Sequence, residues 1–360
     1  MKRIPPLLLT LALLFAGNAD ARRDAVRQDD GPLPPTLAAT GFAATGDPAA
    51  GFAATRPPAA GKAVSLPGKP LPFSPQYPLW TDGADKARWL YLPPGSAIDA
   101  ARPDAWEFPV GTRLWKQFSF GGRPVETRYM EKTRRGWRFA TYLWNADGSA
   151  ATLAPEREVR VRVAGAPGGL HIVPSRRDCL ACHGSAPVPV LGLTALQLSP
   201  DRDPLAPGAG RHAGTDLRTL AASGRLRNLP PALLKQPPRI VADTPVERAA
   251  LGYLHGNCSH CHNTSSRAAP LSLTLAQRAA DPAASRREVL QSVLDRHGRY
   301  GQSDDAVVDA IVAPGLPDRS LLIARMRSRQ PHLQMPPLGT SAPDTQALEL
   351  LHRWIGELTH

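Results

Sequence analysis

Cysteine is scarce in this chain of 360 residues, which contains four cysteines in all. All four lie in two short motifs, so no thiol is left over for another purpose. Long apolar runs are missing too, and the run Leu7–Ala16 near the N-terminus is shorter than the about 20 residues that a membrane-spanning helix needs. We therefore expect no transmembrane anchor, and sulfur chemistry confined to the two motifs.

Acidic residues are outnumbered, with 31 Asp and Glu against 43 Lys and Arg, which gives a formal charge of +12. A basic surplus is typical of proteins that bind nucleic acid, anionic membranes or acidic partners. The sequence shows no aromatic-basic motif of a nucleic-acid-binding module, and arginine is common throughout this Ala-, Pro- and Arg-rich composition. We therefore expect no binding to nucleic acid.

The two motifs read C-x-x-C-H. The first comprises Cys179, Cys182 and His183, and the second comprises Cys258, Cys261 and His262. This is the attachment sequence for c-type haem, in which two cysteines form thioethers to the haem vinyl groups. The following histidine is then the proximal ligand of the iron. The sequence therefore predicts two covalently bound haem groups, with His183 and His262 as axial ligands.

Two other interpretations of the cysteine pairs stay open. Zinc ribbons also use two C-x-x-C pairs, but these pairs are usually separated by about 15–20 residues. Here 75 residues separate Cys182 from Cys258, and zinc does not explain a histidine directly after each pair. A redox-active dithiol leaves both histidines unexplained as well.

The N-terminal part reads as a leader followed by a spacer. Lys2 and Arg3, the short apolar run and the Ala19–Ala21 cleavage pattern predict a signal peptide over residues 1–21. Because c-type haem in bacteria is attached outside the cytoplasm, we expect a periplasmic protein. Residues 22–68 contain a tandem ten-residue repeat, 41–50 and 51–60, rich in Ala, Pro and Gly. We interpret this stretch as a disordered linker.

Residues 69–167 show the period-two alternation of half-buried strands, over 112–120, 125–132, 137–144 and 158–163. Turn sequences such as Gly121-Gly122 separate these strands. Six of the seven tryptophans lie in this region, and we expect them in its core: Trp80, Trp89, Trp106, Trp115, Trp137 and Trp144. The pattern predicts an antiparallel β-sandwich. A ligand-stacking role for the tryptophans is the alternative.

Residues 168–240 form the first haem-binding segment, which has many prolines and few periodic helices. A distal ligand for its iron is hard to find, because no methionine lies between Met130 and Met326. His171, eight residues before Cys179, is the nearest candidate, and His212 and Met130 are the others. Without any of these ligands the iron would be open to small molecules.

Residues 241–360 contain a helix that starts at Asp243-Thr-Pro and runs over 245–256 into Cys258. Further helices are predicted over 286–297, 320–327 and 343–359. The order of helix, C-x-x-C-H, Met335-Pro and aromatic terminal helix resembles a class I cytochrome c domain. The resemblance implies an all-α cytochrome c-like domain in which Met335 is the distal ligand of the second haem.

The region from Tyr77 onward also resembles a bacterial family of exported dihaem c-type cytochromes without a settled activity. The stretches that carry this likeness are Tyr77–Ala84, Trp106–Thr112 and Val125–Arg128. The resemblance implies a multidomain α+β protein, with the β-sandwich followed by the haem-binding segment and the all-α domain.

Electron transfer in the periplasm is the function that these features favour, since a Met/His-ligated iron has a raised reduction potential. The partners would be other redox proteins, acidic ones among them, because basic surface attracts acidic partners. Two alternatives remain: a dihaem peroxidase whose first haem is open, or the haem subunit of an exported dehydrogenase complex. In the favoured interpretation the chain is an electron carrier and not an enzyme. As a peroxidase it would be a haem-dependent oxidoreductase.

Overall fold

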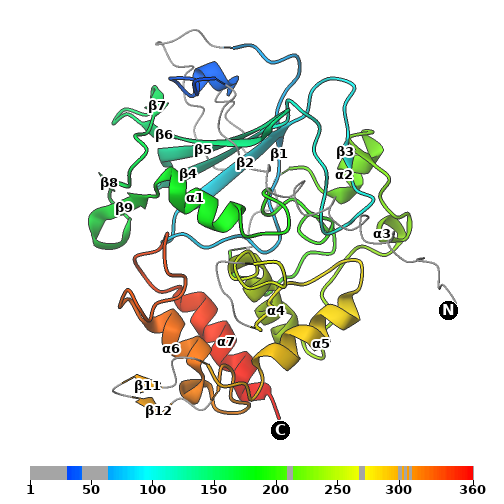
Figure 1. The fold of residues 1–360 in the computed structure, drawn as a ribbon, viewed down its shortest axis with the longest axis vertical. Helices are drawn as coiled ribbons and strands as arrows, with labels where there is room; N and C mark the ends of the chain where they lie inside the picture. Colours follow the sequence, from blue (N-terminus) through cyan, green and yellow to red (C-terminus); the bar gives the residue numbers. More distant parts are fainter. Residues whose placement is uncertain are drawn as a thin grey trace, which may run out of the picture.

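The computed structural model describes residues 31–42, 64–208, 214–266, 272–298, 302–303, 306–307 and 310–359 (Figure 1). Within them the strands are β1 Leu71–Pro72, β2 Asp85–Tyr91, β3 Ile98–Asp99, β4 Arg113–Phe120, β5 Arg123–Thr133, β6 Gly136–Trp144, β7 Ala151–Leu153, β8 Val159–Arg162, β9 Leu170–Val173, β10 Leu226–Arg227, β11 Gln302–Ser303 and β12 Ala306–Val307. The helices are α1 Arg176–His183, α2 Leu217–Ala222, α3 Ala232–Lys235, α4 Pro245–Asn257, α5 Pro282–Val293, α6 Leu321–Arg327 and α7 Thr345–Glu357. Short 3₁₀ turns are η1 Ala38–Thr40, η3 Pro167–Gly169 and η4 Pro317–Arg319. The predicted signal peptide lies outside the described residues.

One antiparallel sheet, in the order β1-β2-β4-β5-β6-β7, forms the N-terminal half of the fold. Its long strands follow the alternation in the sequence, and Gly121 and Gly122 make the β4–β5 turn at positive φ. The mixed α+β class is confirmed, but the predicted sandwich is not what the described residues form. Apart from the small β8–β9 pair, helices and irregular segments cover the sheet, because alternation reveals that a face is covered without revealing by what.

Residues 31–42 cover one face of the sheet, so the linker interpretation is wrong for this part of 22–68. Leu37 and Phe42 are buried there among tryptophans and tyrosines of the strands. The Phe42 ring centroid lies 5.0 Å from that of Trp89 and 5.8 Å from that of Trp115. The indole of Trp115 donates to Thr40 Oγ1 at 2.8 Å. Aromatic burial of this kind stabilises a segment that its composition alone marks as a spacer. The repeat beyond Phe42 lies outside the described residues.

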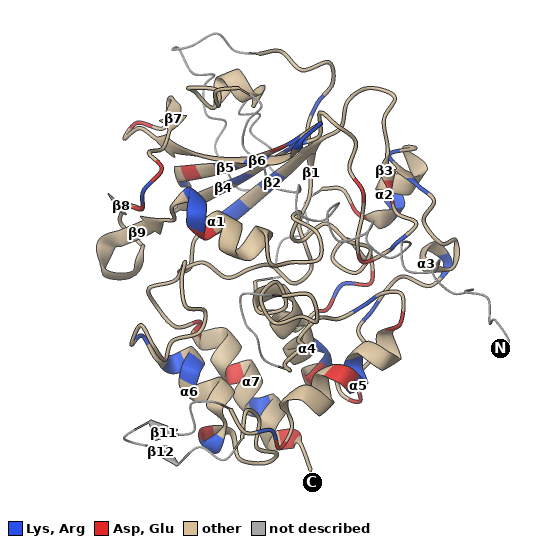
Figure 2. Ribbon diagram, viewed as in Figure 1, with Lys and Arg blue, Asp and Glu red and all other residues tan. Residues whose placement is uncertain are grey.

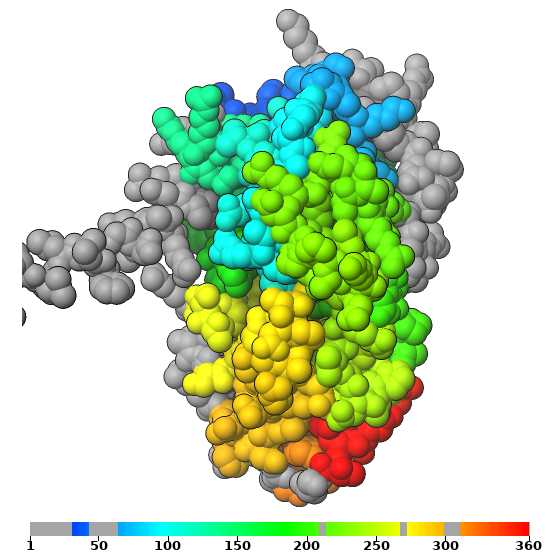
Figure 3. Space-filling model, turned by 90° about the vertical axis from the view of Figure 1, so that its right-hand side faces the viewer, coloured from blue at the N-terminus to red at the C-terminus, as the bar shows by residue number. Residues whose placement is uncertain are grey.

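The opposite face of the sheet belongs to the main hydrophobic core. This core is continuous from Phe73 beside the sheet, through Leu196 in the segment between the motifs, to Ile355 on α7. Figure 3 shows the segment between the motifs, in green and yellow-green, extending from the sheet end to the helical end of the molecule. Four of the six tryptophans predicted in the core are buried, namely Trp89, Trp106, Trp115 and Trp137, while Trp80 and Trp144 are half-buried.

Helices α4 to α7 form the C-terminal half. Helix α4 begins where its sequence predicts, with the Thr244 side chain accepting from the Glu247 N–H and proline at its first turn. Helix α5 begins at Pro282, four residues before the prediction, because the Asp281 side chain caps it. Helices α6 and α7 lie within the predicted ranges. No helix among the described residues has both the length and the apolar character to cross a membrane.

Candidate functional site

Helix α1 carries the first motif. Ser175 and Asp178 form a capping box that starts the helix, so Cys179, Cys182 and His183 lie on its last turns. No residue of α1 is fully buried, although Cys179, Cys182 and His183 are partly covered by the surrounding chain.

His183 is held in one tautomer. Its Nδ1 lies 2.6 Å from the carbonyl oxygen of Pro189, an acceptor, so Nδ1–H donates and Nε2 carries the lone pair. Desolvation, reinforced by Lys116 and Arg128, lowers the pKa of His183 to about 4 despite the Pro189 hydrogen bond. The ring packs against Phe139 of β6, with 5.0 Å between centroids. A neutral, oriented imidazole with a free Nε2 is the form that binds a metal.

The second motif follows α4 without a break. Cys258 caps the helix, since its N–H donates to the Leu254 carbonyl, and the His262 N–H returns to the Cys258 carbonyl at 2.9 Å. These bonds wind the three motif residues into one turn. Asn263 joins this turn to the loop after the first motif, because its Nδ2 lies 3.3 Å from the Ser185 carbonyl. His262 Nδ1 is buried without a hydrogen-bond partner.

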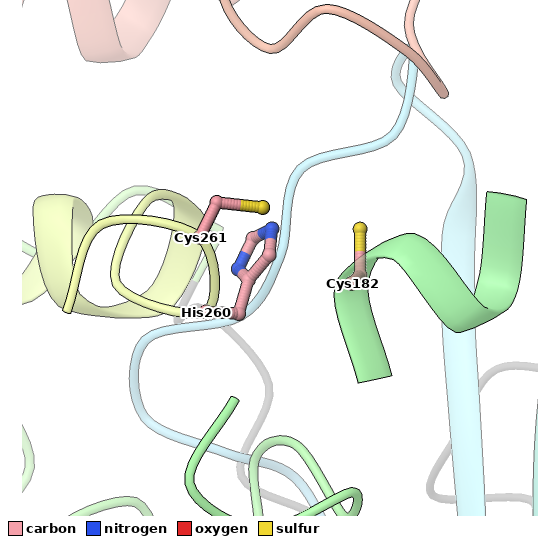
Figure 4. Close-up of side chains that lie close together, drawn as sticks. All are labelled: Cys182, His260 and Cys261. Carbon is pink, nitrogen blue, oxygen red and sulfur yellow. The ribbon is translucent and has the colours of Figure 1, made fainter. Parts of the chain in front are cut away.

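The two motifs meet, although 75 residues separate them in the sequence. Figure 4 shows Cys182 at the end of α1, opposite Cys261 and His260 on the turn after α4. The ligand atoms of these three residues lie within 4.8 Å of one another. A hydrogen bond between the two sulfurs raises the pKa of Cys182 and lowers the pKa of Cys261 to about 4. Two cysteines and a histidine at this spacing are also suitable ligands for zinc.

Met335 lies on a loop between α6 and α7. Its N–H donates to the Arg325 carbonyl at 2.9 Å. The pKa of His262 is lowered mainly by desolvation, and the charge of Arg325 lowers it further. Met335 is half-buried and lies outside the main core, unlike Met326. These contacts bring the backbone of the predicted distal ligand toward the second motif.

The Asp82 carboxylate holds the loop that follows Met335. It accepts from the Ser341 N–H at 2.9 Å, the Ser341 hydroxyl at 2.8 Å and the Ala342 N–H at 3.0 Å. Asp82 itself has a positive φ of 47°. The partners are 259 positions away, so no local signal in the sequence could have revealed them.

The stretch before Asp82 lies against α4. Tyr77 is buried and faces Gly252 and Gly256, at which an added Cβ would overlap it. The Asn257 carboxamide oxygen accepts from the Trp80 N–H at 2.7 Å. The sheet side of the chain therefore holds the helix that leads into the second motif. The glycines of α4 were the signal for this close approach.

His171 is buried away from solvent, with 1% of its surface exposed. Its Nε2 lies 2.9 Å from Glu126 Oε1, and its ring packs against Phe118 and Phe120. The Glu126 carboxylate also accepts from Arg128 at 2.8 Å. One ring nitrogen of the predicted distal ligand is therefore engaged within the sheet. His212 lies outside the described residues, and Met130 packs against the main core.

Comparison with known proteins gives no match to this chain, whether among protein-family models, curated proteins or solved structures.

Proposed function

We propose that the protein is an exported dihaem c-type cytochrome that transfers electrons in the periplasm. Cys179 and Cys182 would hold one haem, and Cys258 and Cys261 the other. The observation that carries the proposal is the meeting of the two motifs, with the sulfurs of Cys182 and Cys261 within 4.8 Å of each other. Two redox groups attached at neighbouring points exchange electrons readily, which is what a carrier with two centres requires.

The residues around each motif fit the group. His183 presents a free Nε2 because its Nδ1–H donates to the Pro189 carbonyl, and hydrogen bonds of this kind orient metal-binding histidines. His262 and Met335 would hold the second haem. When bound, haem supplies an iron that gains and loses one electron. The chain holds the axial ligands, excludes water and sets the potential through ligand type and burial.

A second candidate is a zinc site formed by Cys182, His260 and Cys261, since their ligand atoms already converge. A structural zinc site needs four ligands, and these three residues supply one fewer. This candidate leaves His183 and His262 without a role. It competes with haem for the same two sulfurs, so the two proposals exclude each other.

Mass measurement and a pyridine haemochrome spectrum of the exported protein test the proposal. We expect two covalent haems per chain, and one in the double variant Cys258→Ala/Cys261→Ala. Exported protein at apoprotein mass that carries stoichiometric zinc would overturn it. His260→Gln separates the two candidates, because it removes a zinc ligand and leaves both attachment motifs intact. Two haems in this variant support the cytochrome.

A further inference from the structure

Three adjacent strands place three basic residues in one row on the face of the sheet that adjoins the first motif. Arg88 of β2 pairs with Lys116 of β4, and Lys116 pairs with Arg128 of β5. Directly paired residues of neighbouring strands share a face, so these side chains stand next to each other. Lys86, two positions before Arg88, shares that face as well. Figure 2 shows basic residues on these strands beside α1.

The row is short of counter-charge. Glu126 bonds Arg128 and also contacts His171. Lys86 donates to the Leu79 carbonyl at 2.9 Å, which is a neutral acceptor. Arg88 is 9% exposed, and the described residues supply neither a hydrogen bond nor an ion pair to its guanidinium. Like charges directly opposite each other destabilise a sheet, and a buried charge needs a partner. Among the described residues Glu126 bonds Arg128, and Asp344 and Asp85 act on Lys86, which leaves Arg88 without an anionic partner.

The pKa values of three of the four basic residues are lowered, whereas Glu126 raises the pKa of Arg128 despite desolvation. Desolvation lowers the pKa of Lys86 to about 7 and the pKa of Arg88 to about 10. The pKa of Lys116 is also lowered well below its usual value, by desolvation and then by Arg88, Arg128 and Lys86. Anions bound beside the row would reverse these effects. Cysteine sulfurs cannot be those anions once they are thioethers, because a thioether carries no charge.

An apolar row lies directly beside the basic one. It consists of Leu90, Leu114, Met130 and Phe139, which pair in turn across the same three strands and the neighbouring β6. Phe139 contacts the imidazole of His183, so the apolar row faces the first motif. The face therefore combines an apolar strip with a cationic strip. Leu90, Leu114 and Phe139 are buried in the main core, whereas Met130 and the cations Lys86, Lys116 and Arg128 are half-buried. A ligand with an apolar body and acidic groups at its edge would meet this face at those half-buried residues.

We propose that Arg88 and Lys116, with Lys86 and Arg128 beside them, bind the carboxylates of the haem propionates. This proposal rests on the proposed function and assigns the sheet a role in it: the sheet is a wall of the haem pocket. The chemistry recognised is a carboxylate, and a free small oxyanion would present similar oxygens. We commit to the propionates because the apolar row adjoins the cations.

The test compares the variants Arg88→Gln and Lys116→Met with Arg123→Gln, which removes an exposed arginine of the same sheet. Haem stoichiometry by mass, midpoint potentials and resonance Raman bands of the propionate groups are measured on each holoprotein. We expect two haems throughout, with shifted propionate bands and a lowered potential in the two row variants only. A nearby cation disfavours the ferric state, so removing the cation stabilises that state and lowers the midpoint potential. Lys116→Arg, which keeps the charge, should restore the wild-type bands.

The outcomes separate this proposal from the one on which it rests. Wild-type protein without covalent haem would remove both. Two haems whose propionate bands and potentials respond no more to the row variants than to Arg123→Gln would overturn the propionate assignment alone. A saturable shift of the wild-type spectrum by added phosphate or nitrite, lost in Lys116→Met with unchanged propionate bands, would assign the row to a free oxyanion instead.

Discussion

At the scale of single residues, the two motif histidines differ in what holds their Nδ1 atoms. His183 donates to the Pro189 carbonyl, whereas His262 Nδ1 is buried without a partner. A hydrogen bond at Nδ1 makes the imidazole more electron-donating toward a metal, which favours the oxidised iron. The proposed haem on His183 should therefore have the lower potential. Such a difference would direct electrons from the proposed first haem to the second.

Replacing the two predicted distal ligands should give opposite results. In Met335→Ala the weak far-red absorption of the oxidised protein, which a methionine–iron bond produces, should disappear. In His171→Ala that band should persist, because His171 was a candidate ligand of the other haem and an imidazole gives no sulfur-to-iron absorption. Oxidised and reduced spectra of both variants provide the measurement. Retention of the band in Met335→Ala would overturn Met335 as the ligand.

Glu126 should govern part of the acid stability. Desolvation opposes its ionisation, but Arg128 and His171 prevail and lower the pKa of Glu126 to about 2. A carboxyl whose pKa is lowered in the folded state stabilises the fold above its ordinary pKa, and this contribution is lost as the pH falls toward 2. Removing one partner of a buried charged network costs about 3–5 kcal/mol. Glu126→Gln should therefore destabilise the protein at pH 7. Its free energy of unfolding should also fall less steeply than that of the wild type as the pH is lowered.

Unfolding by urea at several pH values measures this effect. Glu156→Gln is the control, because that carboxylate is 77% exposed in its ion pair with Arg176. Exposed pairs contribute about 0–1 kcal/mol. If the free energy of unfolding falls equally steeply with acidification in wild type and Glu126→Gln, the prediction is wrong.

The motif residues could be read from the sequence because their chemistry depends on spacing within five residues. The network around His171 could not, because Glu126 is 45 positions away. The basic row was equally invisible, since its members become neighbours only through strand register. Residues that act through local spacing are predictable, whereas those that act through pairing across the fold are not.

At the scale of elements, strands and helices follow the sequence closely. The alternating runs became β4, β5, β6 and β8, and the capping pattern at Thr244 became the start of α4. What covers each element was not predictable. Residues 31–42 look like a spacer by composition but pack on the sheet through Leu37 and Phe42. An element's partner depends on contacts that the pattern of the element does not encode.

The contact of α4 with Tyr77 should make Gly252 intolerant of substitution. In Gly252→Ala the new methyl group overlaps the Tyr77 ring, and overpacking of this kind costs about 1–3 kcal/mol. Gly356→Ala on α7 is the matched control, because nothing lies within 4 Å of its added Cβ. Alanine there should stabilise the protein by up to about 1 kcal/mol through helix propensity. Denaturant midpoints measure both, and equal destabilisation would contradict the Tyr77 contact.

At the scale of the whole molecule, the predicted domains share one core. The same cluster of buried side chains includes Phe73, Leu196 and Ile355, which belong to the three successive regions expected from the sequence. We therefore expect one cooperative unfolding transition. The midpoint followed by far-ultraviolet circular dichroism should equal that followed by haem absorbance. Two separated midpoints would show that the helical half unfolds independently of the sheet.

The bond from Asp82 to the loop at Ser341 has a bearing on biogenesis. A newly made chain cannot complete this link until Ser341 has left the ribosome, because Ser341 follows Asp82 by 259 positions. Fragments that end before Ser341 would keep both cysteine pairs but lack the anchor of the Met335 loop. Assembly of the proposed second haem centre would then depend on synthesis having passed Ser341.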